Sequence, residues 1–166
     1  VILRGLCTHC GSCAGLSGGG IKMTESEHGP IPEYINDEII LDDLIYSSCP
    51  GKGINYPNLV KYLFNSQKID WRIGYYKYSY IGYSLNEKIR KNGASGGVIT
   101  SLLLYLLENN LIDGAITLKQ GSPMPWLAEP IIATTSKEII DGAQSVYAPI
   151  PVNIIFDKIK SFQGKL

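Results

Sequence analysis

The sequence predicts a mixed α/β (α+β) fold in which a small cysteine-bearing segment precedes an α/β core. The chain has 166 residues and is 45% apolar, which is enough for one hydrophobic core. Strand and helix patterns alternate after residue 95, as in an α/β core. All four cysteines lie in the first third of the chain. We therefore expect two regions: a ferredoxin-like segment over residues 1–56 and an α/β core over residues 57–166.

The charge pattern excludes several classes of partner. Lys and Arg total 15, and Asp and Glu also total 15, so no basic face for nucleic acid is expected.

No apolar run approaches the ~20 residues that a membrane span needs. The chain starts at Val1 without a basic and apolar leader, which predicts a cytoplasmic protein. It stops at Leu166, where a new strand would begin, so we expect a truncated piece of a longer polypeptide.

The cysteine spacing is the most informative feature. Cys7, Cys10 and Cys13 form a Cys-x-x-Cys-x-x-Cys triplet, and Cys49 precedes a proline. Three thiolates two residues apart, closed by a remote Cys-Pro, match ferredoxin-type ligation, and the count allows one 4Fe-4S cluster. Structural zinc, which prefers two separated Cys-x-x-Cys knuckles, and disulfides, which need an oxidising compartment, are the less favoured alternatives.

Within the triplet, His9 is expected to be a bystander because four cysteines already complete the site. Gly11 is expected to let the loop bend without a side chain. Residues 21–23 are predicted to form a short strand, and residues 37–44 a short amphipathic helix leading to Cys49. Pro57 is well placed in the first turn of the next helix.

Residues 73–84 contain five tyrosines and are predicted to form a strand. Tyr76, Tyr78 and Tyr80 would share one face of it. Aromatic side chains at this spacing more commonly pack against protein than stack on a cofactor or on bases, so packing is the preferred interpretation.

A glycine-rich loop, residues 93–97, is predicted to open a long buried helix over residues 98–107. Ser95, Gly96 and Gly97 are candidate cofactor-binding residues because bare backbone and free helix amides receive a phosphate well. Ser95 would cap the helix or donate to the anion. Tight packing at the start of the helix explains the glycines equally well, so both interpretations stay open.

The remaining elements follow from short local signals. Residues 115–118 and 131–134 are predicted strands, and Thr135 to Glu138 is a capping box that starts a helix. Pro151 is expected to open a last helix that Gly164 terminates.

Four parts of the sequence together resemble the coenzyme F-420 hydrogenase/dehydrogenase beta subunit family. They are the cysteine pattern, Ile89 to Val98 with its Ala-Ser-Gly-Gly core, Leu111 to Ala115, and Ser145 to Pro149. The resemblance implies an iron-sulfur flavoprotein oxidoreductase that passes electrons between a 4Fe-4S cluster, FAD and coenzyme F-420 or another substrate. It also implies a redox partner subunit, and some members act in chlorophyll or polysaccharide metabolism.

The resemblance adds Ser145 and Tyr147 to the candidate cofactor-binding residues. Where the family often carries a cation before this tyrosine, the present chain has Val146. Asp113 and Tyr147 are the candidates for proton transfer, but no catalytic residue is assigned. The rival hypothesis is a non-catalytic electron carrier or assembly module in which the cluster serves as a wire or a structural staple.

Overall fold

The computed structural model describes residues 1–35, 43–66, 70 and 72–166. The N-terminal elements are η1 (Ile2–Arg4), α1 (Ser12–Leu16), β1 (Ile21–Thr24), β2 (Ile31–Tyr34), α2 (Asp43–Ser47) and η2 (Pro50–Lys52). The later elements are α3 (Tyr56–Phe64), α4 (Glu87–Asn92), α5 (Val98–Glu108), β3 (Ala115–Lys119), β4 (Glu129–Ala133), α6 (Ser136–Asp141), η3 (Val152–Ile155) and α7 (Phe156–Ser161).

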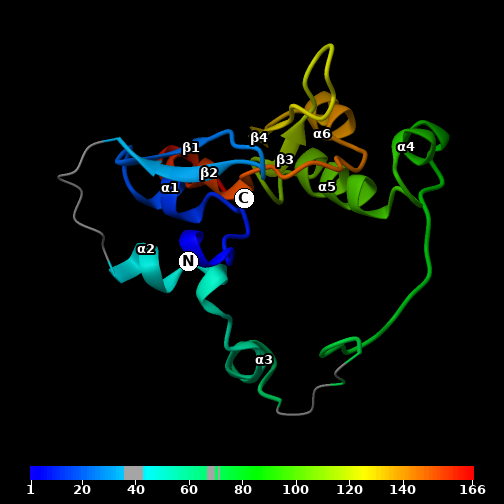
Figure 1. Cartoon of the computed structure of the whole chain (residues 1–166). Coiled ribbons are helices and arrows are strands. Elements are labelled where there is room, and N and C mark those ends of the chain that lie inside the picture. The colour runs from blue at the N-terminus through cyan, green and yellow to red at the C-terminus, as the bar shows by residue number, and fades with distance from the viewer. Residues whose placement is uncertain (36–42, 67–69, 71) are drawn as a thin grey trace.

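Two antiparallel strand pairs organise the molecule (Figure 1). β1 pairs with β2, with Ile21 opposite Tyr34, and β3 pairs with β4, with Ala115 opposite Ala133. The mixed α+β class expected from the sequence is confirmed. Both pairs are hairpins along the chain, because a short connection suffices to join antiparallel strands.

The main hydrophobic core lies between α4, α5, the β3–β4 pair and α6. Its buried residues are Ile89, Leu104, Ala115, Ala133 and Ile139. The capping box at the start of α6 is confirmed: the Thr135 hydroxyl accepts from the Glu138 N–H, and the Glu138 carboxylate accepts from the Thr135 N–H. This reciprocal pair satisfies two amide donors that the helix itself leaves free.

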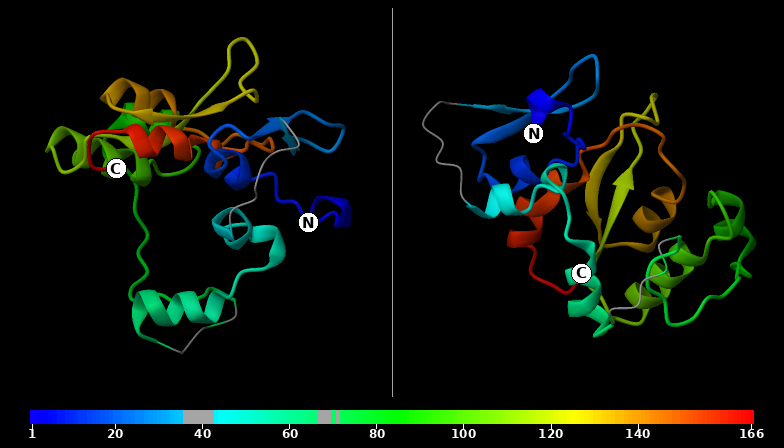
Figure 2. Two further views of the ribbon diagram at one scale, coloured as in Figure 1. Left: turned by 90° about the vertical axis from the view of Figure 1, so that its left-hand side faces the viewer. Right: turned by 60° about the horizontal axis from the view of Figure 1, so that its bottom comes forward.

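The last part of the chain returns to the first. The 3-10 helix η3 and helix α7 pack on α1, so the cysteine segment shares an interface with the end of the chain (Figure 2). The Asn153 backbone N–H donates to the Cys10 carbonyl at 2.9 Å. Residues 1–56 and 57–166, predicted as two regions, are therefore tied together by direct contacts.

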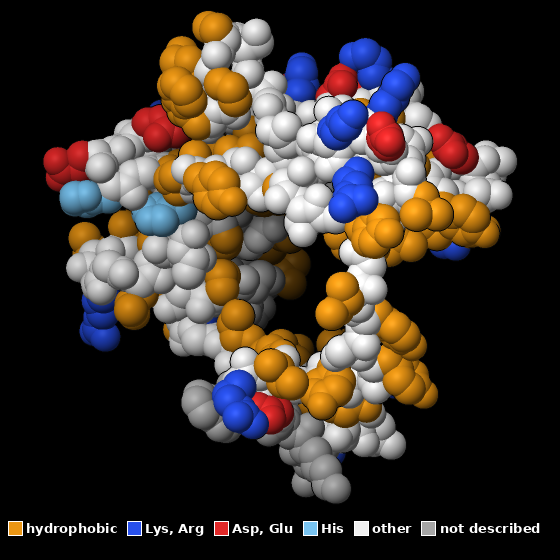
Figure 3. Space-filling view, turned by 90° about the vertical axis from the view of Figure 1, so that its right-hand side faces the viewer, with side chains coloured by type: hydrophobic (Ala, Val, Ile, Leu, Met, Phe, Trp, Pro, Cys, Tyr) orange, Lys and Arg blue, Asp and Glu red, His pale blue; other side chains and the backbone are white. Residues whose placement is uncertain are grey.

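The described residues of 54–85, namely 54–66, 70 and 72–85, extend away from the rest as an arm that carries α3 (Figures 1 and 2). Helix α3 starts with Pro57 in its first turn, as expected, and the Asn55 side chain accepts from the Asn58 N–H. The space-filling view shows many hydrophobic side chains on this arm (Figure 3). Its most exposed ones include Tyr62, Tyr80, Ile81 and Leu85, each more than four-fifths exposed.

The strand predicted over residues 73–84 is wrong. The described part of this segment has no strand, only an isolated bridge between Asp70 and Gly74. Tyr78 and Tyr80 are 77% and 87% exposed, because no neighbouring strand pairs with the segment. Strand propensity reflects packing on a sheet, and where that sheet is missing the propensity has no effect.

Two smaller predictions also differ from the structure, and a third lies mostly outside the described residues. Helix α5 covers the predicted range, but it is not buried all round: Leu104 is buried, whereas Ile99 and Leu102 are more than half exposed. The last helix ends at Ser161, so Gly164 does not terminate it. The helix predicted over residues 37–44 falls mostly outside the described residues, and the described helix α2 begins at Asp43.

Candidate functional site

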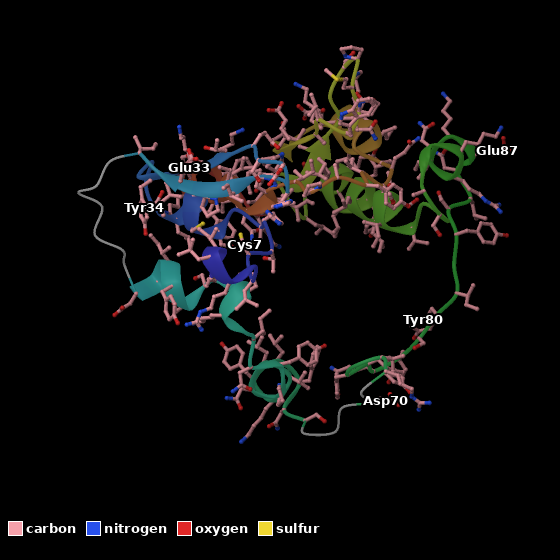
Figure 4. The ribbon with its side chains drawn as sticks, in the orientation of Figure 1. Cys7, Glu33, Tyr34, Asp70, Tyr80 and Glu87 are labelled. Carbon is pink, nitrogen blue, oxygen red and sulfur yellow. The ribbon has the colours of Figure 1, made fainter. Side chains whose placement is uncertain are left out.

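The four cysteines line one cavity of about 160 Å³. Cys7 and Cys10 lie in the loop before α1, Cys13 lies in α1, and Cys49 lies directly before η2. Figure 4 shows Cys7 beneath the β1–β2 hairpin, which carries Glu33 and Tyr34 of the same lining. The rest of the wall is mostly apolar: Val1, Ile2, Ile21, Met23, Pro32, Ile45 and Tyr46.

All four cysteines are partly exposed free thiols, so none is held in a disulfide. Among the described residues, no three His, Cys, Asp or Glu side chains come close enough together to hold a single metal ion. A single zinc ion would need its thiolates about 2.3 Å from its centre. The cavity is far larger than the roughly 10–15 Å³ that one water requires. The cavity therefore leaves room for a group larger than one ion, and its four thiols come from two separate segments.

Cys10 and Cys13 differ in their electrostatic surroundings. Burial alone would raise the pKa of the Cys10 thiol, but hydrogen bonds from the Ser12 side chain and N–H, and from Thr8 and Asn153, together hold that pKa below its ordinary value. Burial raises the pKa of Cys13, and the neighbouring cysteine thiolates raise it further. The protein thus stabilises the charged form of Cys10 better than that of Cys13.

The loop that carries the triplet is shaped by the end of the chain. Gly11 has φ of 79°, and a Cβ there would lie 2.8 Å from the Ile154 Cγ2 atom. The expected backbone role of Gly11 thus has two causes, the left-handed conformation and the close approach of η3. His9 does not line the cavity; its Nδ1 atom lies 2.8 Å from the Pro30 carbonyl and ties the loop to the β1–β2 turn.

A second cavity, of about 430 Å³, brings together predicted residues from two distant segments. Ser95, Gly96 and Gly97 from the glycine-rich loop line it together with Ser145. The first turn of α5, residues 98–100, also faces this cavity. Tyr147 is not among the lining residues and is 94% exposed.

The glycines of this loop have clear backbone roles. Gly97 is the N-cap of α5 with φ of 72°, and no side chain caps the helix, so Ser95 does not have the capping role considered for it. A Cβ on Gly96 would lie 2.9 Å from the Gly82 carbonyl oxygen, and the Gly96 carbonyl accepts from the Ser84 N–H at 2.7 Å. Tight packing against the base of the arm accounts for Gly96, and the positive φ with the close approach of Ile89 accounts for Gly97, whether or not a ligand binds.

Asp113 has a structural contact outside both cavities. Its carboxylate accepts from the Lys165 N–H at 2.7 Å, and its own N–H donates to the Lys165 carbonyl. The aspartate thus holds the end of the chain beside β3. Neither it nor Tyr147 lines the cysteine cavity or the glycine-loop cavity.

Sequence reasoning missed the polar residues around Cys10. Ser12 stands between two cysteines of the triplet, so its position alone was a usable signal. Asn153 had no local signal, because 141 residues separate it from the serine that it contacts.

Comparisons with known proteins match the second half of the chain most clearly. Residues 79–156 match the family described as coenzyme F420 hydrogenase/dehydrogenase, beta subunit N-term. The chain is 33% identical over 86 residues to the coenzyme F420 hydrogenase subunit beta of Methanothermobacter thermautotrophicus, covering 52% of this chain and 30% of that protein. It is 26% identical over 149 residues to the coenzyme F420-dependent sulfite reductase of Methanocaldococcus jannaschii, covering 89% of this chain and 20% of that protein.

Among solved structures, a chain of the F420-reducing [NiFe] hydrogenase complex from Methanosarcina barkeri aligns with a TM-score of 0.43 and 28% identity, covering 49% of this chain and 29% of that one. The present chain spans less than a third of the length of either curated relative named above. Both relatives carry names of F420-dependent oxidoreductases or their subunits. Residues 79–156 are therefore similar to the N-terminal region of the coenzyme F420 hydrogenase/dehydrogenase beta subunit family, the family that the motifs around the glycine-rich loop predicted.

Proposed function

We propose that this chain is the electron-transferring part of an F420-dependent oxidoreductase subunit. In this proposal Cys7, Cys10, Cys13 and Cys49 hold one 4Fe-4S cluster, and the glycine-loop cavity receives the phosphates of FAD. When bound, the cluster would supply one-electron transfer and the flavin hydride chemistry. The observation that carries the proposal is that four thiols line a single cavity, although Cys13 and Cys49 are 36 positions apart in the sequence.

The cysteine segment lies outside the residues that match the family, so the cluster is argued from its own geometry. The triplet presents three thiols from one loop, and Cys49 closes the cavity from beside α2. Apolar neighbours limit the access of water, and exposure to water is one of the factors that set a cluster's potential.

The glycine-loop cavity suits an anionic ligand on physical grounds. The first amides of α5 have no intrahelical partners and carry the positive end of the helix dipole. Ser95 and Ser145, two exposed serines from distant segments of the chain, also line the cavity. A flavin nucleotide offers phosphate oxygens to such donors. The substrate that we infer for the whole enzyme is a deazaflavin of the coenzyme F-420 class, by analogy with the names of the relatives.

The first experiment measures iron, sulfide, zinc and flavin per chain after anaerobic purification. We expect brown protein with about four irons and four sulfides. Iron with no flavin, even after incubation with FAD, would favour the rival electron-carrier module. Stoichiometric zinc in place of iron would overturn the cluster.

The second experiment tests the flavin cavity without disturbing its backbone. Gly97→Val is unsuitable, because a β-branched residue at φ of 72° is strained and its Cβ would lie 3.0 Å from the Ile89 Cγ2 atom. Ser145→Trp instead fills the cavity from an exposed position and should weaken FAD binding at least tenfold while the melting temperature stays near that of wild type. Tyr147→Phe, outside the lining, is the matched control. Equal FAD affinity in wild type and Ser145→Trp would place the flavin elsewhere.

A further inference from the structure

Ser12 lies between a proposed cluster ligand and the far end of the chain. Its Oγ is 3.4 Å from the Cys10 Sγ and 2.8 Å from the Asn153 Nδ2. Ser12 is only 4% exposed, so water does not compete freely for its hydroxyl. The three side chains form a short polar chain beside an otherwise mostly apolar cavity.

The donor and acceptor capacity of each group fixes which atom donates in these two hydrogen bonds. The Asn153 amide can only donate through its nitrogen, so the Ser12 oxygen accepts that bond. A thiolate carries no hydrogen, which means that a ligating Cys10 can only accept. The Ser12 hydroxyl hydrogen is therefore the donor to the sulfur. Asn153 fixes the oxygen whose hydrogen points at Cys10.

The backbone holds Asn153 in place. Its N–H donates to the Cys10 carbonyl at 2.9 Å, while its side chain donates to Ser12, so main chain and side chain together fix the asparagine beside the cysteine loop. Gly15 allows this approach, because a Cβ at that position would collide with the Asn153 carbonyl oxygen. The contact is thus built into the packing of η3 on α1.

We propose that Ser12 and Asn153 are positioning residues that raise the reduction potential of the cluster held by Cys10. A hydrogen bond to a ligating sulfur stabilises negative charge on the cluster, and the reduced cluster is the more negative form. The inference rests on the proposed function, because it requires a cluster at the four cysteines. It adds that a residue near the end of the matched family segment tunes a cofactor bound at the start of the chain.

The test is a redox titration of anaerobically purified full-length protein, followed by the electron paramagnetic resonance signal of the reduced cluster. We expect Ser12→Ala to bind iron like wild type but to favour the oxidised form about tenfold more, which equals about 59 mV for a one-electron couple. Asn153→Ala should shift the potential in the same direction. Ser12→Thr, which keeps the hydroxyl, should restore a potential near that of wild type.

The matched control is Ser17→Ala. Ser17 belongs to the same segment, but its hydroxyl donates to the Ala14 carbonyl at 2.9 Å and not to a cysteine. This variant should lower the melting temperature without moving the potential.

An iron-replete Ser12→Ala protein with the wild-type potential would overturn the inference and leave the proposed function intact. If Ser12→Ala fails to retain iron, Asn153→Ala decides, because it preserves Ser12 and all four cysteines: an unchanged potential overturns the inference and a lower one supports it. Iron-free wild-type protein would overturn the proposed function and this inference with it.

Discussion

At the residue scale, Cys10 and Cys13 are three positions apart but have opposite pKa shifts. Donors from Ser12 and Asn153 outweigh burial at Cys10, whereas at Cys13 burial and neighbouring thiolates prevail. The sequence pattern makes the two cysteines equivalent members of a triplet. The packed structure distinguishes the two thiols, because the charged form is better stabilised at Cys10 than at Cys13.

The ligand set gives the first prediction. Cys49→Ser should lose the cluster as completely as Cys10→Ser, because each thiolate supplies one corner of the same group. Iron and sulfide analysis of anaerobically purified protein measures this loss. His9→Asn is the control: its ring contacts the Pro30 carbonyl and not the cavity, so it should keep about four irons. Full iron content in Cys49→Ser would show that a different residue closes the site.

Gly15 gives a second prediction at this scale. Gly15→Ala would drive a methyl group into the Asn153 carbonyl oxygen, which is backbone and cannot simply rotate away. We expect destabilisation of about 1–3 kcal/mol, the usual cost of overpacking, and a melting temperature lower by roughly 2–4 °C for each of these kcal/mol. Thermal unfolding measures it.

Gly82→Ala is the matched control for that substitution. A Cβ at Gly82 meets only the Val98 Cγ2 atom, at an ordinary 3.8 Å, and its backbone does not adopt the positive φ that disfavours side chains. Its melting temperature should stay close to that of wild type. Equal stability of both variants would mean that η3 does not pack on α1 as described.

At the scale of the element, α6 is the helix whose start is best defined. Thr135→Ala removes the side chain that accepts from the Glu138 N–H. We expect a loss of about 1 kcal/mol of stability, the typical value for an N-cap. Ser136→Ala, whose hydroxyl makes only an exposed contact with Glu108, should change stability by less than about 0.5 kcal/mol. Denaturant unfolding of the three proteins checks the difference.

The same helix gives a pH prediction. The Thr134 N–H, followed by the Thr135 side chain, holds the pKa of the Glu138 carboxyl below its ordinary value. A lowered folded-state pKa means that the carboxylate stabilises the fold fully above about pH 4.3, its unfolded value. That contribution disappears as the pH falls through the lowered pKa. The melting temperatures of wild type and Glu138→Gln should therefore differ near neutral pH and converge in acid; a constant difference would contradict the prediction.

At the scale of the whole molecule, one stretch of chain connects the two proposed cofactor sites. Residues 142–145 line the glycine-loop cavity. Farther along the same stretch, Asn153 contacts Ser12 and Cys10 of the cysteine segment. Asn153 follows Ser145 by eight positions, so the Cα atoms of these two residues lie at most about 26–29 Å apart.

No described helix is long and apolar enough to cross a membrane.

The arm gives the whole-molecule prediction. Lys77 lies in an exposed stretch without strand or helix, whereas Lys137 lies in α6. Exposed irregular segments are the preferred sites of proteolysis. Limited trypsin digestion should thus cut after Lys77 before it cuts after Lys137. The nicked protein should elute as one species in gel filtration until it is denatured, because η3 and α7 hold the C-terminal fragment on α1. Immediate separation of the fragments would contradict this interface.

The features that could be predicted from the sequence are those that depend on neighbours within a few residues. The Cys-x-x-Cys-x-x-Cys spacing, the start of α5 after Gly97 and the capping box of α6 are all of this kind. Backbone hydrogen bonding and left-handed conformations are local, so the residues that satisfy them stand next to one another in the chain. The family resemblance rests on such short motifs as well.

The features that depend on residues distant in the sequence became visible only in the tertiary structure. Tyr76 to Tyr80 have the composition of a strand, but no second strand lies beside them in the described residues, and the segment stays irregular. Helix α5 is apolar along its length, yet only one face meets the core. Ser12 and Asn153 are neighbours in space although 141 residues separate them. Such contacts arise from the packing of η3 on α1, which no local pattern specifies.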